Sequence, residues 1–403
     1  MNSKRFNLIF VANELANNNL NGPNVVFFNL IKTICLNKID YNRFNFYFLV
    51  PSNFKLNDLD INFIDLSKKL KEHKDLNFIK IKKNSKLEIF FNLLRLTKFV
   101  RDYIIFYPRL TFLPFLNNQI SFLYDLPLEK SYIMSENQLK DFIDKQFLFK
   151  KFIINNLKFI FTISNSVRED IIKFLGIDKL DYIYLGVDHE VFKPLKINEV
   201  KKILEKHNLR FKNYFFYPAG KLWFRKNIIN LLLAFHKLIN NSYYKDIELV
   251  ITTNNYNDLR DKYVYQVREV VKKYNLEEKV KFLFVDSKDL VGLYNGAIAV
   301  VFSSYYEGFG LPVLETLACK IPILFSDIPV FNEIFPENPF KFKPNSIENI
   351  YFTFTNFLDL YLKEEKERIN RIIELGYKKI LNFTWDNTIK NLLSKIKQNI
   401  FKE

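Results

Sequence analysis

The sequence feature that most constrains the fold is a short apolar run followed by two serines and a glycine-containing loop. The run spans residues 297–302 and reads Ala-Ile-Ala-Val-Val-Phe. A short run with β-branched side chains is typical of a buried parallel strand. Gly308 and Gly310 then permit a tight turn, and Pro312 suits the first turn of a helix. The stretch therefore predicts a strand, a loop and a helix start in succession, as in an α/β domain.

The predicted helix start offers a site for an anion. Its unpaired backbone N–H groups and the positive end of the helix dipole favour a negative group by roughly 0.3–2 kcal/mol. Glu307 precedes the glycines and Glu315 lies about one helical turn beyond Pro312, and both carboxylates can accept hydrogen bonds from hydroxyls. A phosphate beside hydroxyl groups suggests a nucleotide sugar. Alternatively, this is an ordinary strand–loop–helix connection with two solvated glutamates.

The same stretch resembles a known family signature. Residues 303–315 read Ser-Ser-Tyr-Tyr-Glu-Gly-Phe-Gly-Leu-Pro-Val-Leu-Glu, which is similar to the E-x7-E signature of retaining glycosyltransferases of family 4. The resemblance implies an α/β protein of the GT-B fold, with two Rossmann-like doubly wound domains that face across a cleft. A chain of 403 residues is also long enough for two domains.

The predicted domains follow from this resemblance. We expect an N-terminal acceptor-binding domain at residues 1–193 and a C-terminal nucleotide-sugar-binding domain at residues 194–384. Residues 385–403 are predicted to form a C-terminal helix that crosses back to the N-terminal domain. The resemblance covers nearly the whole chain and is weakest between residues 56 and 118.

Two lysines follow the predicted first strand of the second domain. Residues 215–220 read Phe-Phe-Tyr-Pro-Ala-Gly, and Lys221 and Lys226 come shortly after them. In the family, an arginine usually stands at the first of these positions and a lysine at the second. Two cations there could hold a diphosphate through charge-assisted hydrogen bonds worth roughly 1.5–3 kcal/mol each. Alternatively, the segment is a basic surface turn.

In the first domain, the resemblance points to Gly22 and to the pair Tyr124 and Asp125. Gly22 stands where many relatives carry a Gly-Gly loop before the first helix, although it is also consistent with an ordinary turn. Tyr124 stands where the family commonly has a histidine before the aspartate. Because a phenol stays uncharged near neutral pH, we expect Tyr124 to position the donor rather than shuttle a proton. Alternatively, both residues simply end a strand.

The resemblance thus implies a complete set of site residues. The residues with implied catalytic roles are Glu307, Lys226, Tyr124 and Asp125. The residues with implied donor-binding roles are Lys221, Lys226, Gly308, Phe309, Gly310, Leu311, Glu315 and Gly22. No metal and no cofactor are expected, because the two lysines and the helix N-terminus would neutralise the leaving diphosphate.

Composition limits the partners and the compartment. Cys35 and Cys319 lie far apart without metal-ligand spacing, which favours a reducing compartment, and we expect cytoplasmic residence. No signal peptide and no membrane-spanning run are predicted. The net charge of +16 admits nucleic acid, an anionic membrane surface or an anionic small substrate. Because there is no basic run and no nucleic-acid motif, nucleic acid is not expected as a partner and the membrane surface is ranked first. Residues 85–103 predict a basic amphipathic helix that either lies on such a surface or packs against the core.

The predicted function is retaining, metal-independent transfer of a hexose, of mannosyl or glucosyl type, from a nucleoside-diphosphate sugar to a hydroxyl acceptor. The acceptor is expected to be a glycan or a lipid-linked saccharide in cell-surface polysaccharide synthesis. One alternative is a relative that hydrolyses or epimerises a sugar nucleotide. Another is a scaffold that binds sugar nucleotides without turnover. The sequence does not reveal the sugar, the base or the acceptor.

Overall fold

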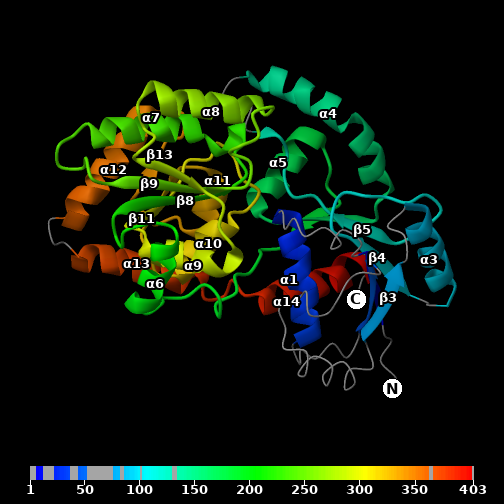
Figure 1. Ribbon diagram of the computed structural model, residues 1–403. Helices are drawn as coiled ribbons and strands as arrows, with labels where there is room; N and C mark the ends of the chain where they lie inside the picture. The colour runs from blue at the N-terminus through cyan, green and yellow to red at the C-terminus, as the bar shows by residue number, and fades with distance from the viewer. Residues whose placement is uncertain are drawn as a thin grey trace. The chain divides into compact units, whose positions relative to one another are not determined.

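The computed structural model of the chain describes residues 6–11, 22–36, 44–51, 76–81, 86–99, 102–128, 134–362 and 366–401. The chain divides into two compact units, and Figure 1 labels their elements. Unit 1 comprises Met1–Leu126, Lys140–Leu185 and Trp385–Glu403, and unit 2 comprises Pro127–Leu139 and Gly186–Thr384. The domain limits expected from the sequence, at residues 193 and 384, stay predictions.

Unit 1 is built on a seven-stranded parallel sheet with the order β3-β2-β1-β4-β5-β6-β7. Its strands are β1 (Phe6–Val11), β2 (Phe44–Pro51), β3 (Leu76–Ile81), β4 (Tyr103–Tyr107), β5 (Gln119–Phe122), β6 (Phe159–Thr162) and β7 (Leu180–Tyr182). Its helices are α1 (Gly22–Leu36), α3 (Lys86–Phe99), α4 (Glu136–Asn156, in unit 1 from Lys140 onward), α5 (Asn165–Leu175) and α14 (Trp385–Ile396), followed by the π-helical turn η5 (Lys397–Phe401). This strand order is that of a doubly wound fold.

The helix predicted for residues 85–103 was wrong at its C-terminal end. Helix α3 ends at Phe99, and Asp102 has a left-handed φ of 50°. Tyr103 begins β4, which pairs in parallel with β1 in the middle of the sheet. The sequence did not separate these elements because the apolar spacing of the helix runs directly into a buried apolar strand.

The C-terminal helix α14 belongs to unit 1. Thr388 Oγ1 donates to the carbonyl of Tyr184 at 3.0 Å, and the Lys395 ammonium lies 2.9 Å from the Asp181 carboxylate. Both bonds join α14 to the segment around β7. The end of the chain is therefore fixed to the last strand of the first sheet.

Unit 2 is built on a six-stranded parallel sheet with the order β10-β9-β8-β11-β12-β13. Its strands are β8 (Tyr214–Gly220), β9 (Glu248–Thr253), β10 (Val280–Leu283), β11 (Ala299–Phe302), β12 (Ile323–Ser326) and β13 (Lys341–Phe342). Its helical elements are α6 (Ile197–Lys206), η4 (Phe224–Lys226), α7 (Ile228–Ile239), α8 (Lys262–Lys273), α9 (Ser287–Gly296), α10 (Leu311–Ala318), α11 (Pro329–Ile334), α12 (Ile347–Leu362) and α13 (Lys366–Ile380).

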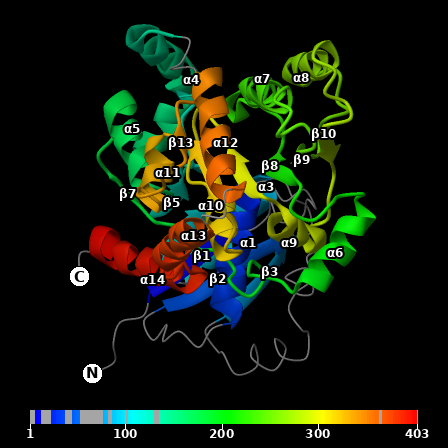
Figure 2. The same cartoon turned by 90° about the vertical axis from the view of Figure 1, so that its left-hand side faces the viewer.

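Helices cover both faces of the second sheet. In Figures 1 and 2, α7 and α8 lie on one face of this sheet, and α9 lies on the opposite face with α6 against it. The chain order reverses between β8 and β11, which are direct neighbours. In doubly wound sheets, ligands bind beyond the carboxyl ends of the strands at such a reversal. The expectation of two Rossmann-like doubly wound domains is confirmed. In unit 2, the reversal predicts a ligand site at the loops after β8 and β11.

Candidate active site

A short basic turn follows β8. Helix η4 carries Arg225 and Lys226, and Asn227 ends it with a left-handed φ of 55°. Asparagine tolerates this conformation better than most residues. The Asn227 side-chain amide donates to the carbonyl of Ser303 at 3.0 Å and to that of Pro344 at 2.6 Å. One buried side chain thus joins the turn to the ends of two other segments.

Further hydrogen bonds fix the same turn to the end of β11. The carbonyl of Lys226 accepts from the Tyr217 hydroxyl and from Ser303 Oγ, both at 3.0 Å. The carbonyl of Arg225 accepts from the backbone N–H of Tyr305 at 2.8 Å. Because these partners come from β8 and from the loop after β11, both sides of the strand reversal hold the basic turn in place.

This arrangement brings Lys226 against Glu307. The Lys226 ammonium lies 2.6 Å from Glu307 Oε1, and Ser304 Oγ donates to the same oxygen at 2.8 Å. The Arg225 guanidinium lies 3.9 Å from Glu307 Oε2. Tyr217 and Ser304 share a further hydroxyl contact of 3.1 Å. Glu307 is only 9% exposed, so it is not the solvated surface charge that an ordinary loop would have.

The charge of Glu307 follows from these neighbours. Burial opposes ionisation, but attraction to Lys226 and then to Arg225, together with the hydrogen bonds from Lys226 and Ser304, outweighs it. The pKa of Glu307 therefore lies below its ordinary value of 4.5. At neutral pH the cluster contains a carboxylate held between two cations.

The glycine loop and the helix start have the expected form. Helix α10 begins at Leu311 with Pro312 in its first turn, which confirms the predicted helix. Gly310 has a φ of +114°, and a Cβ there would lie 2.9 Å from the Phe331 ring, so a side chain would be both strained and obstructed. The Phe309 side chain is buried 6.2 Å from the Phe383 ring. Phe309 can therefore meet a ligand only through its backbone.

Glu315 lies on α10 in different surroundings. Its carboxylate is partly buried and accepts a hydrogen bond of 2.5 Å from the Tyr294 hydroxyl. Burial raises the pKa of Glu315 to about 7, although the bond from Tyr294 lowers it. This second glutamate therefore titrates in the neutral range and lies beside no cation among the residues that the structure describes.

Lys221 lies on the same segment as Lys226 but outside the Glu307 cluster. Its side chain is exposed, and its ammonium lies 5.2 Å from the centre of the Trp223 ring. The Arg225 guanidinium lies 5.3 Å from the same ring, which is 45% exposed. Lys221 and Arg225 thus share an aromatic neighbour, whereas Lys226 is the one of these three cations that reaches Glu307 at hydrogen-bond distance.

The remaining predicted residues belong to unit 1. Gly22 begins α1, and Tyr124 and Asp125 follow the end of β5 at Phe122. The Tyr124 ring lies 5.4 Å from the Phe122 ring. The structure therefore groups Lys221, Lys226, Glu307, the glycine loop and Glu315 within unit 2, and it places Gly22, Tyr124 and Asp125 in unit 1.

Sequence reasoning did not assign a role to Arg225, Tyr217, Ser304 or Tyr294. Arg225 directly precedes Lys226 in the sequence, and this position was a signal that it could be a third cation of the site. Ser304 lies at the end of a predicted strand, where polar side chains often line a site. Tyr294 gave no such signal, because it lies 21 residues before Glu315 and meets it only through the fold.

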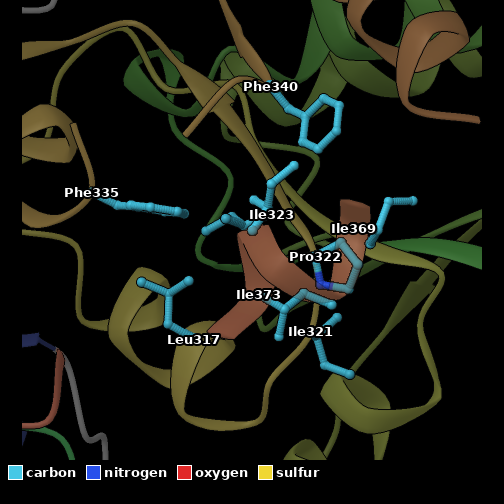
Figure 3. A pocket seen from close by; sticks show the side chains of 9 residues that line it. Leu317, Ile321, Pro322, Ile323, Phe335, Phe340, Ile369 and Ile373 are labelled. Atoms are coloured by element: carbon cyan, nitrogen blue, oxygen red, sulfur yellow. The ribbon is translucent and has the colours of Figure 1, made fainter. Parts of the chain in front are cut away.

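An apolar pocket in unit 2 lies elsewhere and offers no polar group. Figure 3 shows its lining from α10, the segment before β12, and α13. The residues that line it are Leu317, Ile321, Pro322, Ile323, Phe335, Phe340, Ile369, Ile372 and Ile373. A phosphate or a hydroxyl would find no hydrogen-bonding side chain there. The charged cluster after β8 and β11 is therefore the better candidate for chemistry.

Comparisons with solved structures define the class of fold. The sucrose-phosphate synthase of Thermosynechococcus elongatus superposes with a TM-score of 0.71 at 16% identity, covering 99% of this chain and 100% of that one. Anabaena HepE in complex with UDP-glucose superposes with a TM-score of 0.66 at 12% identity, covering 97% and 99%. With two doubly wound parallel sheets, these likenesses identify the α/β GT-B fold.

Sequence comparison adds a match to a family model over part of the chain. Residues 199–379 match the family model of glycosyl transferases group 1. The O-antigen chain mannosyltransferase RfbU of Salmonella typhimurium is 30% identical over 198 residues, which is 48% of this chain and 49% of that protein. The chain thus spans about half the length of this curated relative. The matched family segment contains the basic turn, the glycine loop and both glutamates.

Proposed function

We propose that this chain is a retaining glycosyltransferase that transfers a hexose, of mannosyl or glucosyl type, from a nucleoside-diphosphate sugar to a hydroxyl acceptor. The observation that carries the proposal is the Lys226–Glu307 pair at the strand reversal, next to the first turn of α10. The match to glycosyl transferases group 1 and the likeness to a mannosyltransferase support it.

The residues of unit 2 have separate tasks in this proposal. Lys226 and the N-terminal N–H groups of α10 stabilise the charge that develops on the leaving diphosphate. Glu307 faces the sugar and stabilises positive charge at the anomeric carbon, while Glu315 accepts hydrogen bonds from the ribose hydroxyls. As the sugar–phosphate bond breaks, the leaving phosphate oxygen takes the proton of the acceptor hydroxyl, which attacks from the same face. Lys221 adds positive charge beside the basic turn, and the roles of Tyr124, Asp125 and Gly22 in unit 1 are part of the same proposal.

The proposed acceptor is a glycan or a lipid-linked saccharide of a cell-surface polysaccharide, as the name of the Salmonella relative suggests. We further propose that unit 1 contacts an anionic membrane surface. Phe91 on α3 is 53% exposed and Phe115 is 89% exposed, and Arg95 and Lys98 are exposed on α3. Exposed apolar rings and exposed cations suit the boundary between headgroups and acyl chains. No described helix is both long and apolar enough to cross a bilayer.

Vesicle flotation tests the membrane contact. Phe115→Ser should weaken binding to vesicles that contain phosphatidylglycerol, whereas Tyr243→Ser, which changes a side chain of unit 2 that is 86% exposed, should not. Equal binding to neutral phosphatidylcholine vesicles would contradict the charge argument.

A donor screen followed by product analysis tests the main proposal. UDP- and GDP-linked hexoses are offered with saccharide acceptors, and NMR of the product reports whether the anomeric configuration of the donor is kept. Activity is expected to persist in EDTA. Complete, metal-reversible loss in EDTA would contradict metal independence. Release of a free hexose or an epimer without acceptor would favour hydrolysis or epimerisation, and donor binding without turnover would favour a scaffold.

A further inference from the structure

Tyr294 is a fully buried tyrosine whose hydroxyl meets the second glutamate. It lies on α9, and its hydroxyl donates to Glu315 Oε2 at 2.5 Å. The ring meets Phe216 of β8 edge to face at 5.1 Å and Phe192 at 5.9 Å, with interplanar angles of 86° and 87°. Packing on two sides therefore fixes the ring and with it the direction of the hydroxyl.

Packing alone does not explain a hydroxyl at this place. A phenylalanine would fill the same space, and a buried hydroxyl is costly unless it is hydrogen-bonded. Among the residues that the structure describes, Tyr294 is the hydrogen-bond donor to the Glu315 side chain. Because the bond goes to Oε2, the other carboxylate oxygen is left to accept from a ligand. The hydroxyl thus orients the carboxylate without using its full capacity.

Of Glu315 and the two titratable groups that face it, only Glu315 titrates near neutral pH. Tyr294 faces it from α9, and burial raises the pKa of that phenol well above 10. Cys319 faces it from the end of α10, and burial raises the pKa of that thiol as well. Both neighbours stay protonated and neutral in the working range of pH. The Glu315 carboxyl changes charge there, and the bond from Tyr294 favours its charged form.

We propose that Tyr294 is a positioning residue of the donor site, which holds Glu315 so that its free oxygen accepts from a ribose hydroxyl and so sets a preference for ribonucleotides over 2′-deoxyribonucleotides. This inference rests on the proposed function, since it assumes that a nucleoside diphosphate lies at α10. It adds that the ribose preference depends on a residue that never touches the ligand. The preference is also lost as Glu315 becomes protonated.

The test compares ribo and deoxy probes on the full chain. Calorimetric titrations use UDP and dUDP, and GDP and dGDP, with wild type, Tyr294→Phe and Glu315→Gln. Tyr214→Phe is the matched control, because this buried tyrosine of unit 2 donates to the backbone carbonyl of Leu293 at 2.7 Å instead. Wild type should prefer the ribo form by about tenfold, the scale of one hydrogen bond to a charged group. Tyr294→Phe should reduce this ratio by about three- to tenfold, while Tyr214→Phe leaves it unchanged.

The pH profile separates positioning from simple loss of packing. In wild type the ribo preference should fall as the pH drops below about 7. Without the bond from Tyr294, Glu315 is harder to ionise, so the same fall should occur at higher pH in Tyr294→Phe. Glu315→Gln should show no such dependence. If Tyr294→Phe does not fold, 3-fluorotyrosine at position 294 should strengthen the bond and move the fall to lower pH.

The outcomes distinguish the role of Tyr294 from the proposed glycosyltransferase activity. A ribo preference that survives in Tyr294→Phe with an unchanged pH profile would overturn the role of Tyr294 and leave the glycosyltransferase proposal standing. Failure of wild type to bind either UDP or GDP would overturn both. In the Glu315→Gln background, the further change Tyr294→Phe should leave the ribo-to-deoxy ratio unchanged. This result would support the inference, because Tyr294 then acts through Glu315.

Discussion

The loop before α10 and the helix itself each contain a glutamate, and the two carboxylates have pKa values shifted in opposite directions. Glu307 lies in the loop before α10 with Lys226 at 2.6 Å and Arg225 at 3.9 Å. Glu315 lies on the helix itself, where a tyrosine hydroxyl is its described donor. Both carboxylates lose water. The first has a pKa below 4.5, and the second has one of about 7.

The difference shows that burial alone does not decide the charge of a carboxylate. Where cations are built into the same cluster, attraction outweighs desolvation and the group stays ionised. Where the neighbour is a neutral hydroxyl, desolvation wins and the group titrates near neutral pH. A fixed negative charge suits the stabilisation of a developing cation, whereas a hydrogen-bond acceptor suits a hydroxyl of the donor.

Removal of Lys226 should have the largest effect on the difference between the two glutamates. Lys226→Ala should lower turnover by about 10²–10³, the scale for loss of one charge-stabilising donor. It should also lower stability, because the buried Glu307 carboxylate would keep the hydrogen bond from Ser304 but only the more distant Arg225 among its described cations. Lys237→Ala, which removes an exposed pair with Glu348, should change neither. Full turnover of Lys226→Ala at saturating donor would show that Lys226 has no role in the reaction.

The double variant Lys226→Ala/Glu307→Gln separates chemistry from folding. Its melting temperature should recover towards that of wild type, since no buried charge is left alone. Its turnover should stay low. Recovery of both quantities would mean that Lys226 serves the fold and not the reaction.

Substitution of the two glutamates should change different steady-state kinetic constants. Glu307→Gln should lower kcat more than donor affinity, because its charge matters most as positive charge develops at the anomeric carbon. Glu315→Gln should chiefly raise the donor KM, by the equivalent of about 1.5–3 kcal/mol if a charged hydrogen bond is lost. The reverse pattern, with kcat affected only by Glu315→Gln, would exchange the two roles.

Stability should depend on pH with opposite sign at the two positions. The folded chain holds the Glu315 proton more tightly than the unfolded chain does, so this group destabilises the fold as the pH rises from 4.5 to about 7, by up to about 3 kcal/mol. Glu307 contributes stability above 4.5 and loses it as the pH falls through its lowered pKa. The melting temperatures of wild type and the two Gln variants are compared at about pH 8, about pH 4.5 and about pH 2.5, where the upper interval measures the effect of Glu315 and the lower interval that of Glu307. Equal pH dependence in all three would contradict the comparison.

Arg225 should have the smallest effect. Its guanidinium lies 3.9 Å from Glu307, which is long for a hydrogen bond, so Arg225→Gln should lower turnover by less than about tenfold. Loss of this cation should also raise the pKa of Glu307, so the acid limb of the kcat profile should move to higher pH. Arg225→Lys should restore most of that shift. An unchanged acid limb would show that Lys226 alone sets the charge of Glu307.

Much of the fold was predictable because the signals were local. The apolar run at 299–302, the glycines and Pro312 lie side by side in the sequence and dictate strand, loop and helix with little help from distant residues. β4 was missed because its apolar residues continue the pattern of α3, and the left-handed Asp102 that separates them has no clear sequence mark.

The residues of the site were predictable only where they belong to a recognisable sequence motif. Lys226 and Glu307 were both expected, but their 2.6 Å contact joins residues 81 positions apart and depends on β8 and β11 being neighbours. Tyr294 could not be predicted for the same reason, since its hydroxyl gains a partner only when α9 packs beside α10. The roles of Tyr124, Asp125 and Gly22 stay predictions.

The anchoring of the basic turn has a consequence for hydrogen exchange. Loops between a strand and a helix usually open often and exchange their amide protons quickly. Here the Tyr305 amide is bound to the Arg225 carbonyl, and Asn227 fastens the turn to Ser303 and Pro344. Opening this loop would break bonds to β8, to the segment after β11 and to the segment after β13 together. In deuterium oxide the Tyr305 amide should therefore exchange on the slow time scale of the sheet, and the cations should need little rearrangement when a diphosphate arrives.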